Sequence, residues 1–202
     1  MNHEILKITD LPSIDDLVKS SQSLALLDAI LMPDWQGRYF SFNRHWNQSG
    51  NEMMASMRNG SGSEYFVLFT ECGAVGKVFD DEAGNAGEKM LARVPDSFVA
   101  FKDEPAFQVD SATFFFWHLK DDHSDWEASP NTLSGYAYLN FLVAGSDHYH
   151  AWAESYYERV IDKRTVREVF DNRNFTEKQL LTLNPDLVIA DLRGDVEEIV
   201  VR

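Results

Sequence analysis

The chain has 202 residues and a formal net charge of −15, with 33 acidic against 18 basic residues. Hydrophobic residues make up 44% of it and aromatic residues 13%, which supplies a core and excludes an intrinsically disordered chain. Acids exceed bases in residues 1–100, 14 against 8, and in the remainder, 19 against 10, so no charged tail accounts for the excess. Such a field repels phosphate groups, so we expect neither nucleic acid nor a membrane surface as a partner. A basic protein partner is compatible with the charge, although solubility alone is the favoured explanation.

The cysteine content and the apolar segments indicate in which cellular compartment the protein is expected. The single cysteine, Cys72, cannot form an intramolecular disulfide, which is typical of a reducing environment. Residues 1–4 lack the basic and apolar stretches of a signal peptide. The longest apolar run, residues 24–32, contains Asp28 and is too short to span a bilayer. We therefore expect a cytoplasmic protein.

The first expected element is a helix that ends before Pro33. Ser13 followed by Asp16 resembles a capping box, with Asp as the acceptor in place of the usual Glu. Apolar residues then recur on one face at helical spacing, at Leu17, Leu24, Leu27 and Leu31.

Residues 34–79 predict an antiparallel meander. Aromatic and β-prone runs at residues 38–43, 53–58, 65–70 and 74–79 alternate with short breaks, several of which carry glycine. After a surface loop at residues 80–89, residues 95–101 predict a short helix with Phe98 and Phe101 facing inward. A further strand at residues 113–119 is almost wholly apolar and is therefore expected to be central.

The rest of the chain predicts mainly helices. Residues 121–131 form an expected polar loop that carries Trp126, and residues 136–144 fit a strand or a helix equally well. A helix is expected from near Ser146, with an inward stripe of Tyr149, Trp152, Ala153, Tyr156 and Val160. Residues 176–179 form a capping box for a helix that ends at Asn184, and a further helix is expected from Asn184 to Gly194. The end of the chain, residues 196–202, fits a frayed helix or a small strand.

The order of these elements indicates the fold class. A helix, a meander and then helices are typical of an α+β fold rather than of alternating βαβ units. We expect an antiparallel β-sheet of about five to six strands, packed by an N-terminal helix and by C-terminal helices. Residues 1–202 are expected to form a single domain, in which residues 146–202 are a helical C-terminal part.

The best sequence candidate for a metal site is the loop of residues 118–125. It contains His118, Asp121, Asp122 and His123, and residues 147–150 add His148 and His150. Imidazole and carboxylate groups bind zinc, iron or manganese, and such a site would support a metal-dependent hydrolase. Neither segment has an established ligand spacing, and His148 and His150 point about 200° apart on a helix. A solvated acidic loop is the favoured interpretation, and we predict no bound metal and no cofactor.

Nucleophilic catalysis has no coherent set of residues in this sequence. Cys72 stands in a predicted turn beside Glu71, whose charge would raise the pKa of the thiol. Residues 60–63, Gly-Ser-Gly-Ser, match neither a nucleophile elbow nor a phosphate-binding loop. The sequence leaves open whether the protein is an enzyme and favours the answer that it is not.

Aromatic and arginine residues near the start of the meander are the candidate binding residues. Trp35, Trp46 and also Trp126 stand at expected loop edges, where tryptophan is over-represented among binding hot spots. Arg38, Arg44 and Arg58 lie in the same part of the chain and could pair with an anion or with nearby acids. Methionines in this region fit core packing better than an adaptable binding surface. The predicted binding residues are Trp35, Arg38, Arg44 and Trp46.

Several segments resemble those of a family of uncharacterised bacterial cytoplasmic proteins. These are residues 35–43, the run Glu-Met-Met-Ala-Ser-Met-Arg-Asn-Gly-Ser-Gly at 52–62, and Ala-Trp-Ala-Glu-Ser-Tyr-Tyr-Glu at 151–158. The resemblance implies a cytoplasmic α+β protein and carries no activity. In size and acidity the chain is also similar in style to bacterial toxin-immunity proteins. The functional hypothesis is therefore a non-enzymatic protein that binds another protein in an immunity-like or regulatory role, with the metal-dependent hydrolase as the alternative.

Overall fold

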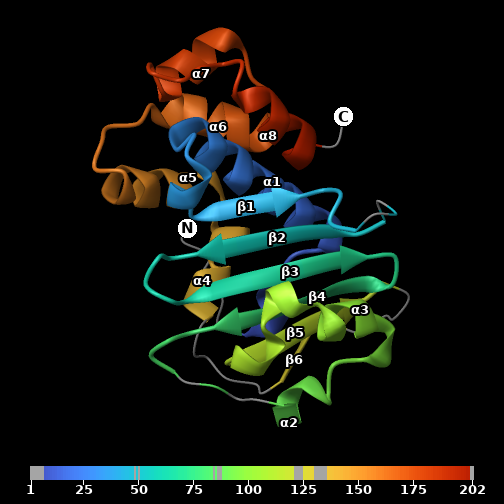
Figure 1. Cartoon of the computed structure of the whole chain (residues 1–202). Helices are drawn as coiled ribbons and strands as arrows, with labels where there is room; N and C mark the ends of the chain where they lie inside the picture. Colours follow the sequence, from blue (N-terminus) through green and yellow to red (C-terminus); the bar gives the residue numbers. More distant parts are fainter. Residues whose placement is uncertain are drawn as a thin grey trace.

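The computed structural model describes residues 7–47, 49, 51–83, 85, 88–120, 125–129 and 136–200. Within these ranges, six strands form one antiparallel sheet in which the strand order follows the chain (Figure 1). They are β1 (Phe40–Asn43), β2 (Met53–Arg58), β3 (Glu64–Thr70), β4 (Gly73–Phe79), β5 (Phe114–Leu119) and β6 (Glu127–Ser129). With the helices that pack on this sheet, the predicted α+β class is confirmed.

Helix α1 (Ile14–Leu31) lies between the sheet and the C-terminal helices. The Ser13 hydroxyl accepts a hydrogen bond from the Asp16 amide at 3.2 Å and caps the start of the helix as expected. Side chains on all sides of the second half of α1 are fully buried, including Leu24, Leu26 and Ile30. A helix buried all round needs packing partners on every side, and α1 has them in β1, α5, α6 and α8.

The C-terminal helices stack beyond the β1 edge of the sheet (Figure 1). They are α5 (Phe141–Tyr156), α6 (Lys163–Asn172), α7 (Glu177–Leu183) and α8 (Leu192–Ile199), whereas α4 (Tyr136–Leu139) lies behind the sheet at β3. The amide of Arg44, directly after β1, donates to the carbonyl of Glu198 in α8 at 3.0 Å. One buried cluster joins side chains of α1, the sheet and these helices.

Short helices cover the other face of the sheet over β3 to β5. They are α2 (Glu88–Leu91), α3 (Val99–Asp103) and the 3-10 turns η3 (Asp96–Phe98), η4 (Pro105–Phe107) and η5 (Val109–Ser111). A second, smaller core lies beneath them and includes Phe98, Phe101, Phe107 and Phe115. Two further 3-10 turns, η1 (Ile8–Asp10) and η2 (Trp35–Gly37), flank α1.

Strand alternation leaves part of this second face open at β1 and β2. Phe40 and Phe42 of β1 face α1, so Ser41 and Asn43 lie on the opposite side. No helix of the described chain covers that side of β1 and β2 in Figure 1. On this side Ser41 and Asn43 of β1 are partly exposed, whereas Ser56 of β2 is buried.

The strand predictions were right for the meander and wrong in detail further on. The apolar strand β5 is the fifth of six strands rather than central, and it is buried because both of its faces are covered. Within the segment predicted to be a polar loop, residues 127–129 form β6. The predicted short helix after Pro95 is split into η3 and α3, and both Phe98 and Phe101 are buried as expected.

Several helix predictions need correction. Residues 136–144, which fitted either state, are helical, and α5 begins at Phe141 rather than near Ser146, with a kink at Gly145. Val160 lies beyond α5 and is 95% exposed, so its place in the inward stripe was wrong. The surface loop predicted for residues 80–89 gives way to α2 at Glu88. Helix α6 was not predicted.

The boundaries of the last two helices agree with the prediction for α7 and differ from it for α8. The capping box at Thr176 and Gln179 opens α7, and Asn184 caps its end as expected. No helix runs from Asn184 to Gly194, because residues 185–191 form turns and α8 begins only at Leu192. Gly194 therefore lies inside a helix rather than at its end. In the described part of the chain, no helix combines the length and hydropathy needed to cross a membrane.

Candidate functional site

A hollow of about 140 Å³ opens at the outer edge of β1, lined by residues of η2, β1, β2 and α8. We call it the β1-edge hollow, and its principal lining residues are Trp35, Arg38, Ser41, Asn43, Trp46, Met54, Asp195 and Glu198. Three of the four predicted binding residues therefore come together here. The fourth, Arg44, lines a separate groove on α8.

Trp35 is the most exposed large aromatic side chain of the hollow. The Asp34 carboxylate accepts the Gln36 amide hydrogen at 3.0 Å and fixes the turn that carries Trp35. The indole is 54% exposed, and the Arg58 guanidinium lies 4.2 Å from its ring centroid. Burial lowers the pKa of Arg58, although arginine remains charged at any physiological pH. The cation–π contact orients the indole while leaving it accessible to a partner.

Arg38 has a positioning role in the hollow, because protein groups occupy its guanidinium. It donates to both carboxylate oxygens of Asp195, at 2.6 and 2.8 Å, and to the carbonyls of Met32 and Pro33, each at 2.9 Å. This paired geometry fixes the start of α8 against the segment that joins α1 to β1. A ligand would have to displace these contacts to reach Arg38.

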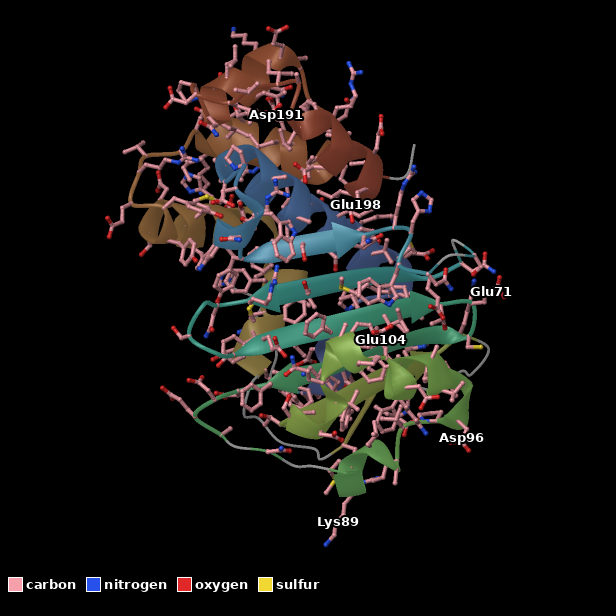
Figure 2. All side chains as sticks on the ribbon, viewed as in Figure 1. Glu71, Lys89, Asp96, Glu104, Asp191 and Glu198 are labelled. Carbon is pink, nitrogen blue, oxygen red and sulfur yellow. The ribbon has the colours of Figure 1, made fainter. Side chains whose placement is uncertain are left out.

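Glu198 is the acidic group of the hollow that has no ion-pair partner among the described residues. Figure 2 shows it on α8, beside β1. Partial burial and the nearby Asp195 raise the pKa of its carboxyl group, whereas Arg38 and His45 lower it. The hydroxyl of Ser41 is 2.6 Å from that of the buried Ser56, so these two groups hydrogen-bond to each other. A positively charged or hydrogen-bond-donating group fits this wall of the hollow.

The predicted tryptophans differ in how much surface they offer. Trp46 stacks on Phe107 of the second core, with ring centroids 5.4 Å apart and planes inclined by 18°, so it anchors one side of the hollow. Trp126 was expected at a loop edge but is buried, with its indole N–H donating to the Pro12 carbonyl at 2.8 Å. The methionines of this region were expected to pack in the core, and Met54 and Met57 are buried.

The candidate metal loop falls mostly outside the described residues. His118 lies in β5, where its Nδ1 is 2.9 Å from the Leu119 carbonyl and its ring packs on Trp126. Asp121, Asp122 and His123 are not among the described residues. His148 packs against Phe141, and burial lowers its pKa, whereas His150 Nε2 lies 2.8 Å from the Ile161 carbonyl. Within the described ranges, no three His, Cys, Asp or Glu residues gather as a metal would require.

Sequence reasoning missed the α8 side of the hollow. The expected helix ended at Gly194, yet Asp195 lies in the first turn of α8 and binds Arg38. Arg38 and Asp195 are 157 residues apart in the chain, so no local pattern could have joined them. Arg58 was recognised only as one of three neighbouring arginines. Its contact with Trp35 depends on the pairing of β2 with β1.

Comparison with known proteins identified no similar protein. No protein-family model matches the chain, and neither a curated protein nor a solved structure matches it.

Proposed function

We propose that this protein acts by binding a protein partner through the β1-edge hollow, in a non-enzymatic regulatory or immunity-like role. The observation that carries the proposal is the half-exposed Trp35, which Arg58 holds in place beside the hollow. Binding hot spots are enriched in tryptophan because the indole buries a large area with few rotatable bonds. Preorganisation by Arg58 lowers the entropy lost when a partner covers the ring.

The charge of the molecule supports a basic partner. Glu198 and Asp195 line the hollow, and the chain as a whole carries a net charge of −15. Acidic side chains are spread over the molecule, from Asp191 and Glu198 near the C-terminal helices to Glu71, Asp96 and Glu104 at the other end (Figure 2). Such a field steers a basic protein toward the surface, and Glu198 is placed to receive a basic side chain.

Site-specific photo-crosslinking in the source cells tests this proposal. A photoreactive residue at Gln36, which is exposed beside Trp35, leaves the hollow intact. We expect one discrete basic protein in the adduct, and we expect it to be lost when Trp35→Ala or Glu198→Lys is added. The control is a photoreactive residue at Val99, which is 56% exposed and lies on α3. The same adducts at both positions, or none at Gln36, would overturn the proposal.

The metal-dependent hydrolase remains a prediction, because Asp121, Asp122 and His123 are not described. Metal analysis of the purified protein separates the two hypotheses. Stoichiometric zinc, iron or manganese that disappears in His123→Ala would replace the binding role with metal chemistry at residues 118–125.

A further inference from the structure

The C-terminal helices enclose a second and larger concavity that the proposed function does not use. It has a volume of about 650 Å³ and lies along α8, on the Arg44 side. We call it the α8 groove. Its walls are mainly apolar and come from α7, from α8 and from the segments before each of them. The apolar lining residues are Phe175, Leu180, Ile189, Leu192, Val196 and Val200. Small-molecule sites in proteins usually have about 300–1,000 Å³ and apolar walls with a few polar groups.

The polar groups of the α8 groove are two arginines and one glutamate. Arg193 belongs to the first turn of α8, whereas Arg44 contacts the last turn, through its amide to the Glu198 carbonyl and through its guanidinium to the Val200 carbonyl at 3.4 Å. Glu197 lines the groove between them and is exposed. Neither arginine forms an ion pair with any residue that the structure describes.

Arg44 is the better anion-binding group of the two arginines. Its Nε is buried and has no hydrogen-bond partner in the described part of the chain, and its side chain is partly buried while that of Arg193 is exposed. Because Arg44 lines the groove and has no carboxylate partner among the described residues, a ligand carboxylate can pair with its guanidinium there. An ion pair is also stronger where the surroundings exclude water.

We propose that the α8 groove binds a small amphipathic carboxylate, with the carboxylate on Arg44 and the apolar chain along α8. The stretch from Leu192 to Val200 spans about 12 Å at the helical rise, which matches an extended chain of about nine or ten carbons. The apolar walls bury the chain, and the arginine at one end pairs with the carboxylate. This proposal is independent of the proposed function, since α8 separates the groove from the β1-edge hollow.

Isothermal titration of the purified full chain with decanoate, below the concentration at which it forms micelles, tests the ligand class. We expect one site per chain, about tenfold or more tighter for decanoate than for 1-decanol or for decyltrimethylammonium. Shortening the chain from decanoate to octanoate should weaken binding about fifteenfold, because two methylenes are lost and each buried methylene contributes about fourfold. The absence of decanoate binding to folded protein would overturn the proposal. Equal binding of decanol would do so as well.

Variants of the groove test its location. Ala190 lines the groove and is exposed, so Ala190→Phe fills the groove without disturbing the core and should weaken decanoate binding about tenfold or more. Ala100→Phe, at an exposed position on α3, is the matched control and should leave binding unchanged. Arg44→Gln should weaken decanoate binding about tenfold, whereas Arg193→Gln should weaken it less than about threefold. Circular dichroism confirms folding, and Ala190→Met replaces Ala190→Phe if the latter does not fold. Unchanged binding in both the filled-groove variant and Arg44→Gln would overturn the assignment.

Discussion

The hydroxyl of Tyr149 donates to the buried carboxyl of Asp28 at 2.7 Å, which joins α5 to α1 in the middle of the protein. The other oxygen of Asp28 accepts the backbone amides of Tyr39 and Phe40, each at 2.8 Å. One side chain of α1 therefore fixes both the start of β1 and the position of α5. The buried Tyr157 hydroxyl lies near the same carboxyl but forms no hydrogen bond of ordinary geometry with a described residue.

Asp28 should make the protein less stable as the pH rises from about 4 to about 6. Burial raises the pKa of this carboxyl from 3.8 to about 6, although the hydrogen bonds from Phe40 and Tyr149 oppose the increase. The folded state then holds a proton that the unfolded state has released, so stability falls through this interval by about 3 kcal/mol. Asp28→Asn keeps an acceptor for the amides and removes the titration. Urea unfolding across this pH range should show a correspondingly smaller decline for the variant.

Asp16→Asn is the control with the opposite sign. Hydrogen bonds from Lys19 and Ser13 hold the pKa of the Asp16 carboxyl below its usual value. This residue therefore stabilises the protein above its unfolded pKa, and the contribution is lost as the pH falls. A steeper decline with rising pH in Asp28→Asn than in the unmodified protein would contradict the burial argument.

The ion pair between Arg38 and Asp195 should be among the strongest in the described structure. Both oxygens of Asp195 are engaged, and only 6% of the Arg38 side chain and 24% of the Asp195 side chain are exposed. Arg38→Met should cost about 3–5 kcal/mol of unfolding free energy, because it leaves a carboxylate and two carbonyls without their donor. A double-mutant cycle with Asp195→Asn should give a coupling of about 2 kcal/mol.

The exposed pair of Arg164 and Glu168, at 2.8 Å, is the matched comparison. The same cycle there should give a much smaller coupling, since solvent screens both groups. Equal couplings at the two pairs would mean that Arg38 does not tie α8 to the sheet.

The meander could be predicted from sequence because its signals are local. Alternating side chains and short glycine-bearing turns specify β2, β3 and β4 without reference to the rest of the chain. The C-terminal helices have weaker local signals. A helix was expected to start at Asn184, yet the helix begins only where Leu192 and Val196 can pack on the core. Tertiary packing decided that boundary.

Lys77 should hold the 3-10 turns of the second face in place. Its ammonium is fully buried, 2.9 Å from Glu64, and donates to the Gln108 carbonyl and the Ser111 hydroxyl. Lys77→Met should cost about 2–4 kcal/mol and should speed hydrogen exchange in residues 105–111. Lys102→Met removes a similar contact, but its partner Asp96 is fully exposed, so the loss there should be much smaller.

Two glycines in helices should respond to alanine with opposite signs. Gly145 has a φ of 74° at the kink of α5, which alanine adopts only under strain, so Gly145→Ala should cost about 1–3 kcal/mol. Gly194 lies within α8 with no atom near an added Cβ, so Gly194→Ala should stabilise the protein by about 0.5–1 kcal/mol. Thermal unfolding of both variants measures the two effects. A stabilising Gly145→Ala would mean that the kink is not required by packing.

The candidate site was predictable only in part, for a physical reason. Trp35, Arg38 and Trp46 are close in sequence, so their convergence follows from one turn and one strand. The groups that give the hollow its charge come from α8, and long-range packing alone places them there. Exposure is also set by packing, which is why Trp126, similar to Trp35 in local sequence context, is buried.

Trp35 and Trp46 should separate binding from stability. Trp35 is half-exposed, so Trp35→Ala should cost less than about 1 kcal/mol of unfolding free energy, while Trp46→Ala removes a ring stacked on Phe107 and should cost about 2–4 kcal/mol. Partner affinity should fall about thirtyfold or more in Trp35→Ala, as expected for a hot-spot tryptophan. Urea unfolding and titration with the crosslinked partner measure the two quantities. A Trp35→Ala variant that binds normally would leave the indole without a role in recognition, whatever its stability.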